Sequence, residues 1–267
     1  MGSEIDRLLD GLTLIASRAA EAILAVPRLD LNRRDKADAS PVTAADDAAE
    51  TVILAGLGRL LPGVPIVSEE STGNRSVEGL GQRFVIVDPL DGTREFLADL
   101  DEYTVNIALV DNETPRLGVV AAPARGLIWR GCVGHGAERL ALTPGAAPDA
   151  ARERVPIHTR IQPAVGARVL VSRSHQDAAT DTYLDRLPRA ERIPCGSSLK
   201  FCLVAEGSAD LYPRLGAISE WDIAAGHAVL VAAGGTMQRL DGGVLRYGQG
   251  NFLVPGFIAS GDGKAGK

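Results

Sequence analysis

Apolar residues recur at helical spacing in the N-terminal part of the chain. Within residues 4–25 the apolar positions lie three or four residues apart, charged residues occupy the other face, and Pro27 follows. This pattern predicts an amphipathic helix that packs against the core. A second stripe spans about residues 43–61, where Thr43 with Asp46 at the capping-box position is typical of a helix start.

Short apolar runs follow, and two of them end in acidic residues. Residues 64–67 precede Ser68-Glu69-Glu70, and residues 84–87 precede Asp88 and Asp91. Acids at the exits of two short strands suggest that the strands are neighbours and that the acids converge. Three further strands, with turns but no helix between them, predict an antiparallel meander over residues 103–110, 117–122 and 127–133.

The order of the predicted helices and strands changes near residue 150. Residues 142–165 are rich in Ala, Pro, Gly and Arg, and short strands then alternate with helices up to an apolar helix over residues 221–233. We therefore expect an α/β (α+β) protein with two halves. Residues 1–150 would form an N-terminal α+β half, and residues 151–267 a C-terminal α/β half.

Composition and charge exclude several classes of function. The chain has 267 residues, 45% hydrophobic and 23% charged, with a net charge of −6. This charge gives no general attraction to a nucleic acid polymer, and no apolar run reaches the roughly 18 residues of a transmembrane segment. The three cysteines lack zinc-like spacing and the N-terminus lacks a signal-peptide pattern, so a reducing cytoplasmic setting is expected. Loose peripheral membrane association, and the choice between monomer and homodimer, stay open.

The segment from Asp88 to Thr93 carries the first candidate chemistry. Two carboxylates three residues apart follow a buried strand, where unpaired charges are unfavourable. Carboxylate oxygens, together with the carbonyl of Leu90, suit Mg²⁺. The amides of Gly92 and Thr93 could bind an anion. The alternative is an ordinary Asp-Pro and Asp-Gly turn.

Two more acids stand at helix starts. Asp46 and Asp222 would each complement the helix dipole, which is a sufficient structural role by itself. Taken with Glu69, Asp88 and Asp91, however, they indicate an oxygen-ligand site for two or three Mg²⁺ ions.

These motifs resemble a known family. Asp88-Pro89-Leu90-Asp91-Gly92-Thr93, preceded by Ser68-Glu69-Glu70 and followed by Trp221-Asp222-Ile223-Ala224-Ala225-Gly226, is similar to the double signature of the inositol monophosphatase superfamily. Residues 40–46, 103–108, 172–175 and 196–207 are similar to bacterial 3′(2′),5′-bisphosphate nucleotidases of the CysQ type. The resemblance covers about residues 5–257.

The resemblance implies a fold and a metal centre. The fold would be a layered α-β-α-β-α sandwich with an N-terminal antiparallel sheet and a smaller C-terminal mixed sheet. Glu69, Asp88 and the Leu90 carbonyl would hold one Mg²⁺, and Asp88, Asp91 and Asp222 a second. Thr93, oriented by Asp46, would polarise a metal-bound water, with Glu69 sharing the proton transfer beside a third, weaker ion.

The resemblance also implies that residues 1–150 bind the metal and that residues 151–267 set the substrate specificity, with substrate contacts in both halves. Lys200 and Arg214 would neutralise a second phosphate that the metals do not hold. The full set of expected contacts is Gly92, Thr93, His175, Ser197, Lys200, Arg214 and Asp222. The structural alternatives are an exposed helix charge for Lys200 and an ordinary loop position for His175.

The expected activity is hydrolysis of adenosine 3′,5′-bisphosphate to AMP and phosphate by metal-activated water. The sulfated nucleotide would be a related substrate, in sulfur metabolism, and Li⁺ an inhibitor. An inositol or sugar monophosphate phosphatase with the same metal centre is the alternative. A non-catalytic nucleotide sensor is disfavoured by the intact acids, and a dinucleotide-dependent dehydrogenase by the lack of a glycine fingerprint after an early strand.

Overall fold

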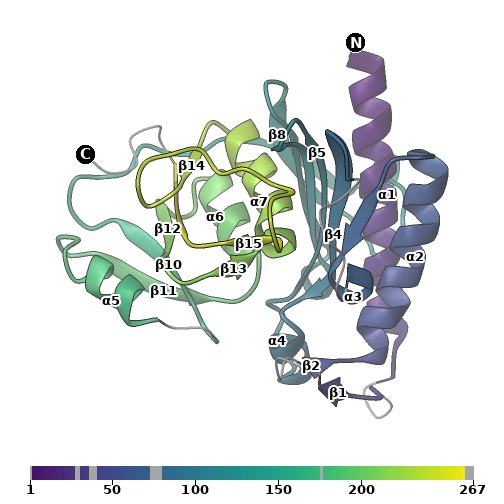
Figure 1. Ribbon diagram of the computed structural model, residues 1–267, viewed down its shortest axis with the longest axis horizontal. Coiled ribbons are helices and arrows are strands. Elements are labelled where there is room, and N and C mark those ends of the chain that lie inside the picture. Colours follow the sequence, from purple (N-terminus) through teal and green to yellow (C-terminus); the bar gives the residue numbers. More distant parts are fainter. Residues whose placement is uncertain (1, 28–30, 36–40, 73–79, 175–176, 262–267) are drawn as a thin grey trace.

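The computed structural model describes residues 2–27, 31–35, 41–72, 80–174 and 177–261. Helices and sheets alternate in layers across the molecule (Figure 1). The layers are a helix pair, a seven-stranded sheet, a second helix pair, a five-stranded sheet and one outer helix. The expected α-β-α-β-α sandwich is confirmed.

The first layer consists of α1 (Gly2–Ala25) and α2 (Ala44–Leu60). The capping box predicted for α2 is present: the Thr43 hydroxyl accepts a hydrogen bond from the amide of Ala45 (3.1 Å), and the Asp46 carboxylate accepts one from the amide of Thr43 (2.8 Å). Before this helix, β1 (Arg34–Asp35) pairs antiparallel with β2 (Pro41–Val42).

The second layer is a sheet with the strand order β3-β4-β5-β6-β7-β8-β9. β3 and β4 run parallel, and every other neighbouring pair in this sheet is antiparallel, as the predicted meander requires. The bounds are β3 (Ile66–Ser68), β4 (Arg83–Asp91), β5 (Thr104–Asp111), β6 (Thr114–Ala122), β7 (Leu127–Cys132), β8 (Gly136–Ala141) and β9 (Glu153–Ile157).

Both faces of this sheet are buried because side chains alternate along each strand. On β4, Val85 and Val87 pack toward α1 and α2, whereas Phe84 and Ile86 join the core between the two sheets. The same alternation on β5 and β6 explains why these strands read as continuous apolar runs in the sequence.

The acidic segment after residue 87 is part of strand β4, so the alternative of an ordinary turn there is wrong. Asp88 pairs with Asn106, and Asp91 pairs with Thr104, so β4 has one residue more than β5 in this interval. Such an extra residue forms a β-bulge, which accommodates Pro89 because proline has no N–H to donate to the ladder. Leu90 stays buried, and the strand continues to Asp91.

The seven-stranded sheet also extends beyond residue 150, the boundary expected between the halves. β9 begins at Glu153, and its residues pair with β8 from Ala137↔Ile157 to Ala141↔Glu153. The segment rich in Ala, Pro, Gly and Arg therefore still contributes an edge strand to the N-terminal sheet.

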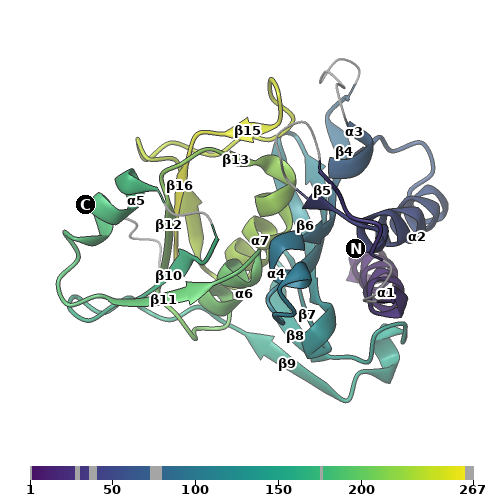
Figure 2. The same ribbon diagram turned by 90° about the horizontal axis from the view of Figure 1, so that it is seen from below.

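The third layer, α6 (Leu199–Ala205) and α7 (Glu220–Ala232), lies between the two sheets (Figure 2). α7 approaches β6 closely because Gly118 has no side chain; a Cβ there would lie 2.3 Å from the carbonyl oxygen of Ala225. This close packing carries Asp222, in the first turn of α7, to the N-terminal sheet.

The fourth layer has the strand order β11-β10-β12-β16-β14, with β10 parallel to β11 and β12 and the remaining pairs antiparallel. This is the smaller mixed sheet that was expected. Its strands are β10 (Arg168–Ser172), β11 (Glu191–Cys195), β12 (Leu211–Arg214), β14 (Thr236–Gln238) and β16 (Phe257–Ser260), and α5 (Ala178–Leu184) covers its outer face.

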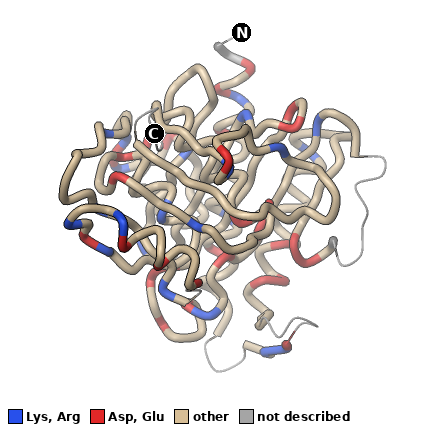
Figure 3. The backbone as a smooth tube through the Cα atoms, turned by 60° about the vertical axis from the view of Figure 1, so that its left-hand side comes forward, with Lys and Arg blue, Asp and Glu red and all other residues tan. Residues whose placement is uncertain are grey.

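The remaining elements are short: the helices α3 (Glu69–Thr72) and α4 (Thr93–Leu97), the 3-10 turns Pro123–Arg125 and Pro148–Ala150, and the strand pair β13 (Ile218–Ser219) and β15 (Leu253–Val254). Acidic and basic positions are interspersed along the backbone (Figure 3). Within the described residues, none of the helices combines the length and the apolar character needed to cross a bilayer.

Candidate functional site

A cavity of about 230 Å³ lies where the two halves of the molecule meet. Its walls come from the ends of β3 and β4, from α4, and from the C-terminal segments around α6, β12 and α7. Ten of the predicted site residues line it: Glu69, Asp88, Leu90, Asp91, Gly92, Thr93, Ser197, Lys200, Arg214 and Asp222. His175, also predicted, lies outside the described residues.

Three carboxylates from three elements converge at one end of this cavity. The parallel pairing of β3 with β4 sets Ser68 beside Val87, so Glu69 and Asp88 leave the sheet at the same edge. Asp222 reaches them from α7. Oxygen atoms of Glu69, Asp88 and Asp222 lie within 4.8 Å of one another. The predicted convergence of the strand-end acids is thus present, joined by an acid from the other half.

The electrostatics of this cluster favour a bound cation. Burial, and after it the negative charge of Glu69, raises the pKa of Asp88 well above its usual range. Burial and the charge of Asp91 do the same to the pKa of Asp222, which Arg214 lowers in part. Buried carboxylates that repel one another are unfavourable unless a cation neutralises them, and an all-oxygen set suits Mg²⁺. The residues present fit that ion.

Asp46 is not among the residues that line the cavity, but it contacts Thr93, which is. The hydroxyl of Thr93 is 3.2 Å from Asp46 Oδ1 and 3.2 Å from the carbonyl oxygen of Leu90. Oδ2 of Asp46 accepts from the amide and hydroxyl of Thr43, at 2.8 and 2.7 Å. The same carboxylate therefore caps α2 with one oxygen and meets Thr93 with the other. Burial raises the pKa of Asp46 to about 6.

Asp91 differs from the other acids because hydrogen-bond donors surround one of its oxygens. Oδ2 accepts from the hydroxyl of Ser197 (2.7 Å) and the amide of Ser198 (2.8 Å), and Asn106 Nδ2 lies 3.5 Å away. Ser197, predicted to contact substrate, thus lines the cavity but also holds an acid of the opposite half. Its φ of +54° is unusual for a residue with a side chain.

Two cations of the C-terminal half, Lys200 and Arg214, also line the cavity. Lys200 is only 3% exposed, so the alternative of an exposed helix charge is wrong. Its Nζ donates to the carbonyl oxygens of Cys195 (3.1 Å) and Ser197 (2.6 Å). Arg214 donates from Nη2 to Ala217 (3.4 Å), while its buried Nε meets no acceptor among the described residues.

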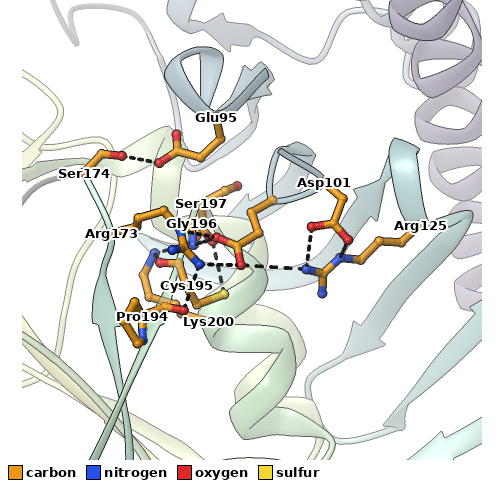
Figure 4. A network of polar contacts seen from close by, with 11 residues as sticks. Glu95, Asp101, Arg125, Arg173, Ser174, Pro194, Cys195, Gly196, Ser197 and Lys200 are labelled. Carbon is orange, nitrogen blue, oxygen red and sulfur yellow. Dashed lines mark hydrogen bonds and ion pairs between the residues drawn. The ribbon is translucent and has the colours of Figure 1, made fainter. Parts of the chain in front are cut away.

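A network that the sequence did not predict joins the two halves beside the cavity (Figure 4). Glu102, just before β5, accepts from Arg173 Nε (2.8 Å), Arg173 Nη2 (2.9 Å) and the amide of Gly196 (2.8 Å). Burial alone would raise the pKa of Glu102, but these hydrogen bonds lower it. Nearby, the hydroxyl of Ser174 donates to Glu95 of α4. No pattern in the sequence pairs these residues, which lie far apart along the chain.

Comparisons with known proteins agree with the fold. The model of the "Inositol monophosphatase family" matches residues 4–265. The chain is 43% identical over 258 residues to the 3′(2′),5′-bisphosphate nucleotidase CysQ of Escherichia coli strain K12, covering 95% of this chain and 99% of that protein.

Two solved structures show the same architecture. CysQ from Bacteroides thetaiotaomicron superposes with a TM-score of 0.80 at 34% identity, covering 95% of this chain and 97% of that one. An inositol monophosphatase from Anabaena superposes with a TM-score of 0.74 at 25% identity, covering 98% and 92%.

Proposed function

The chain belongs to the inositol monophosphatase family, and from this premise we propose that it is a Mg²⁺-dependent 3′(2′),5′-bisphosphate nucleotidase. Its substrate would be adenosine 3′,5′-bisphosphate, which it would hydrolyse to AMP and phosphate. One observation carries the proposal: a single cavity is lined both by converging carboxylates and by two cations, Lys200 and Arg214. A substrate with two phosphates matches this lining, because metal ions on the carboxylates would hold one phosphate and the two cations the other.

The carboxylates of the cavity would hold two or three Mg²⁺ ions. Glu69, Asp88, Asp91, Asp222 and the Leu90 carbonyl would supply the oxygen ligands. When bound, the ions would neutralise charge on the phosphoryl group and make water more acidic, which supports in-line displacement of an alcohol from phosphate.

The residues around Thr93 would handle the proton and the phosphate. An ionised Asp46 accepts the hydrogen bond of the Thr93 hydroxyl, at 3.2 Å, and so orients the oxygen lone pairs of Thr93 toward the cavity. The Thr93 oxygen can take a proton from the attacking water as its own hydroxyl proton passes to Asp46, or the Glu69 carboxylate can accept the proton of the water directly. The amides of Gly92 and Thr93, at the bulged end of β4, would donate to phosphate oxygens.

The two cations, Lys200 and Arg214, would select the second phosphate. The ammonium of Lys200 has three N–H donors and uses two on carbonyl oxygens, so one remains for a phosphate oxygen. The buried Nε of Arg214 would gain a partner in the same way. Ser197, Asp222 and His175 complete the proposed contacts with the nucleotide.

The proposal extends to the setting of the enzyme. The sulfated form of the nucleotide would be a second substrate, which places the activity in sulfur metabolism, and Li⁺ would inhibit by taking a Mg²⁺ position. The three cysteines are all free and buried, in keeping with a reducing cytoplasm.

Comparing two substrates with purified protein and Mg²⁺ tests the proposal. We expect kcat/KM for adenosine 3′,5′-bisphosphate to exceed that for inositol 1-phosphate by about 100-fold or more, since each charge-assisted hydrogen bond contributes about 1.5–3 kcal/mol. A preference for the inositol ester would support the monophosphate phosphatase instead. If neither substrate releases phosphate, the chain is a binding protein and the proposal is wrong.

A further inference from the structure

Ser198 occupies the residue position that normally caps a helix, but its side chain does not cap. It precedes α6 with φ −69° and ψ −4°, and its hydroxyl makes no hydrogen bond to the first amides of that helix. The side chain is nevertheless buried, with 1% of the residue exposed. A buried hydroxyl that does not cap its helix needs another hydrogen-bond partner. The partners of the Ser198 hydroxyl lie on β4, β5 and α7.

The hydroxyl of Ser198 contacts both acids that the two halves bring together. It lies 2.5 Å from the carbonyl oxygen of Asp222 and 3.0 Å from Oδ2 of Asp91. It also accepts a hydrogen bond from Asn106 Nδ2, at 2.9 Å. A hydroxyl has one proton to donate, and the shorter distance makes the Asp222 carbonyl its main acceptor. The backbone amide of Ser198 donates a separate hydrogen bond to Asp91 at 2.8 Å.

These contacts turn the two carboxylates toward the cavity. The hydrogen bonds that the described residues donate to Asp91 all end on Oδ2, which leaves Oδ1 for the cavity that Asp91 lines. At Asp222 the Ser198 hydroxyl holds the backbone, so the carboxylate stays with Glu69 and Asp88. Asp91 belongs to β4 and Asp222 to α7, and Ser198 spans the gap between them.

We propose that Ser198 is a positioning residue of the metal centre, which sets Asp91 and Asp222 at the separation that a shared cation requires. Asn106 supports it from β5. The inference rests on the proposed function, because it assumes that this cavity binds divalent cations. Groups that orient metal ligands contribute strongly to affinity, and their loss typically weakens metal binding by about 10–100-fold.

Direct metal binding by Ser198→Ala tests this role. Free Mn²⁺ would be measured by electron paramagnetic resonance during titration of metal-free protein, with no substrate present. We expect the affinity of one site to fall about tenfold. The Mg²⁺ concentration for half-maximal activity should rise by a similar factor, while KM for the nucleotide at saturating Mg²⁺ stays the same.

Ser174→Ala is the matched control. It also removes a serine hydroxyl that reaches a carboxylate of the opposite half, Glu95, but that acid is not part of the proposed metal centre. Its Mn²⁺ affinity should equal that of the unmodified protein. Equal losses in both variants would mean that docking of the halves in general, and not Ser198, controls metal binding, and would overturn the inference.

The outcomes separate the two proposals. If the unmodified protein binds no Mn²⁺, the metal-dependent function fails whatever Ser198 does. If it binds Mn²⁺ and Ser198→Ala binds equally well, the positioning role is wrong and the function stands. Should Ser198→Ala not fold, Asn106→Ser provides the same measurement: weaker Mn²⁺ binding supports the role, and unchanged binding overturns it.

Discussion

The two halves of the molecule contribute opposite chemistry to one cavity. The N-terminal half supplies carboxylates at strand ends: Asp88 is buried, and the negative charges of Glu69 and Asp91 act on it. The C-terminal half supplies hydroxyls and cations, such as Ser197, Lys200 and Arg214, together with the single acid Asp222. Under the proposed function, this difference would separate the reaction, which needs cations held by acids, from substrate choice, which needs donors and positive charge.

Asp88 and Asp91 show this difference at the scale of one strand. Asp88 lies among acids, and inside the protein its carboxylate accepts a hydrogen bond from the amide of Leu90 at 3.0 Å. Asp91, three residues later, accepts from Ser197 and Ser198 of the other half. The bulge between them allows neighbouring carboxylates to face different regions. A change in the C-terminal half that moves Ser197 or Ser198 should therefore also move Asp91, and so affect the proposed metal site.

The largest effect is expected for Asp91→Asn. The donors around Oδ2 would hold the amide oxygen of the new side chain, which turns its NH₂ group toward the cavity, where it cannot bind a cation. We expect kcat to fall by at least about 100-fold, the upper end of what losing a supporting partner costs. Asp101→Asn, which removes only the ion pair with Arg125, serves as the control. A near-normal rate for Asp91→Asn at saturating Mg²⁺ would remove this residue from the metal centre.

Lys200→Met tests the other region with an intermediate effect. Methionine keeps the buried stem but loses the ammonium. We expect kcat/KM for adenosine 3′,5′-bisphosphate to fall about 10- to 100-fold, as for one charge-assisted hydrogen bond, while hydrolysis of a monophosphate ester falls much less. Parallel assays of both substrates check this. Equal losses would show that Lys200 acts by holding the carbonyl groups of Cys195 and Ser197 and not by selecting the second phosphate.

The smallest effect concerns stability at the interface of the two regions. His227 of α7 is buried, its Nδ1 lies 2.8 Å from the Tyr247 hydroxyl, and burial lowers its pKa from 6.5 to about 4. Between these two pH values His227 is protonated in the unfolded chain but neutral in the folded protein. The free energy of unfolding therefore falls as the pH drops from 6.5 toward 4. His227 should account for roughly 2–3 kcal/mol of this loss by pH 4.5.

The comparison of the unmodified protein with His227→Asn isolates this contribution. Denaturant unfolding in chelator at pH 7.5 and 4.5 would give the free energies of unfolding. Because the acids of the cavity titrate in both proteins, their contributions cancel in the difference. An equal loss of stability in both proteins would mean that His227 is not the group that responds.

Much of the fold was predictable because local patterns carry it. The stripes of α1 and α2, the capping box at Thr43 and the apolar runs and turns of the meander are properties of adjacent residues, and each predicted the observed element. The acids of the cavity were found for a related reason. Carboxylates at the ends of apolar strands need compensation wherever they occur, so the sequence alone marks them as candidates.

Other features had a misleading local alternative, or were missed, because pairing across long distances decides them. The segment Asp88–Asp91 resembles a turn, but pairing with β5 keeps it in the strand. Lys200 resembles a surface charge, but burial against Tyr212, 5.0 Å from its ring centre, makes it a wall of the cavity. The bond between Glu102 and Arg173 has no local signal at all.

The sequence by itself thus determined which side chains could bind cations and phosphate, because composition and spacing within short segments encode that chemistry. Only the tertiary structure decided how these side chains are oriented. The orientation of Asp91 depends on a serine pair more than a hundred residues away, brought in by α6, and the position of Asp222 depends on α7 packing against Gly118. Such contacts arise from the fit of whole layers, which no single segment specifies.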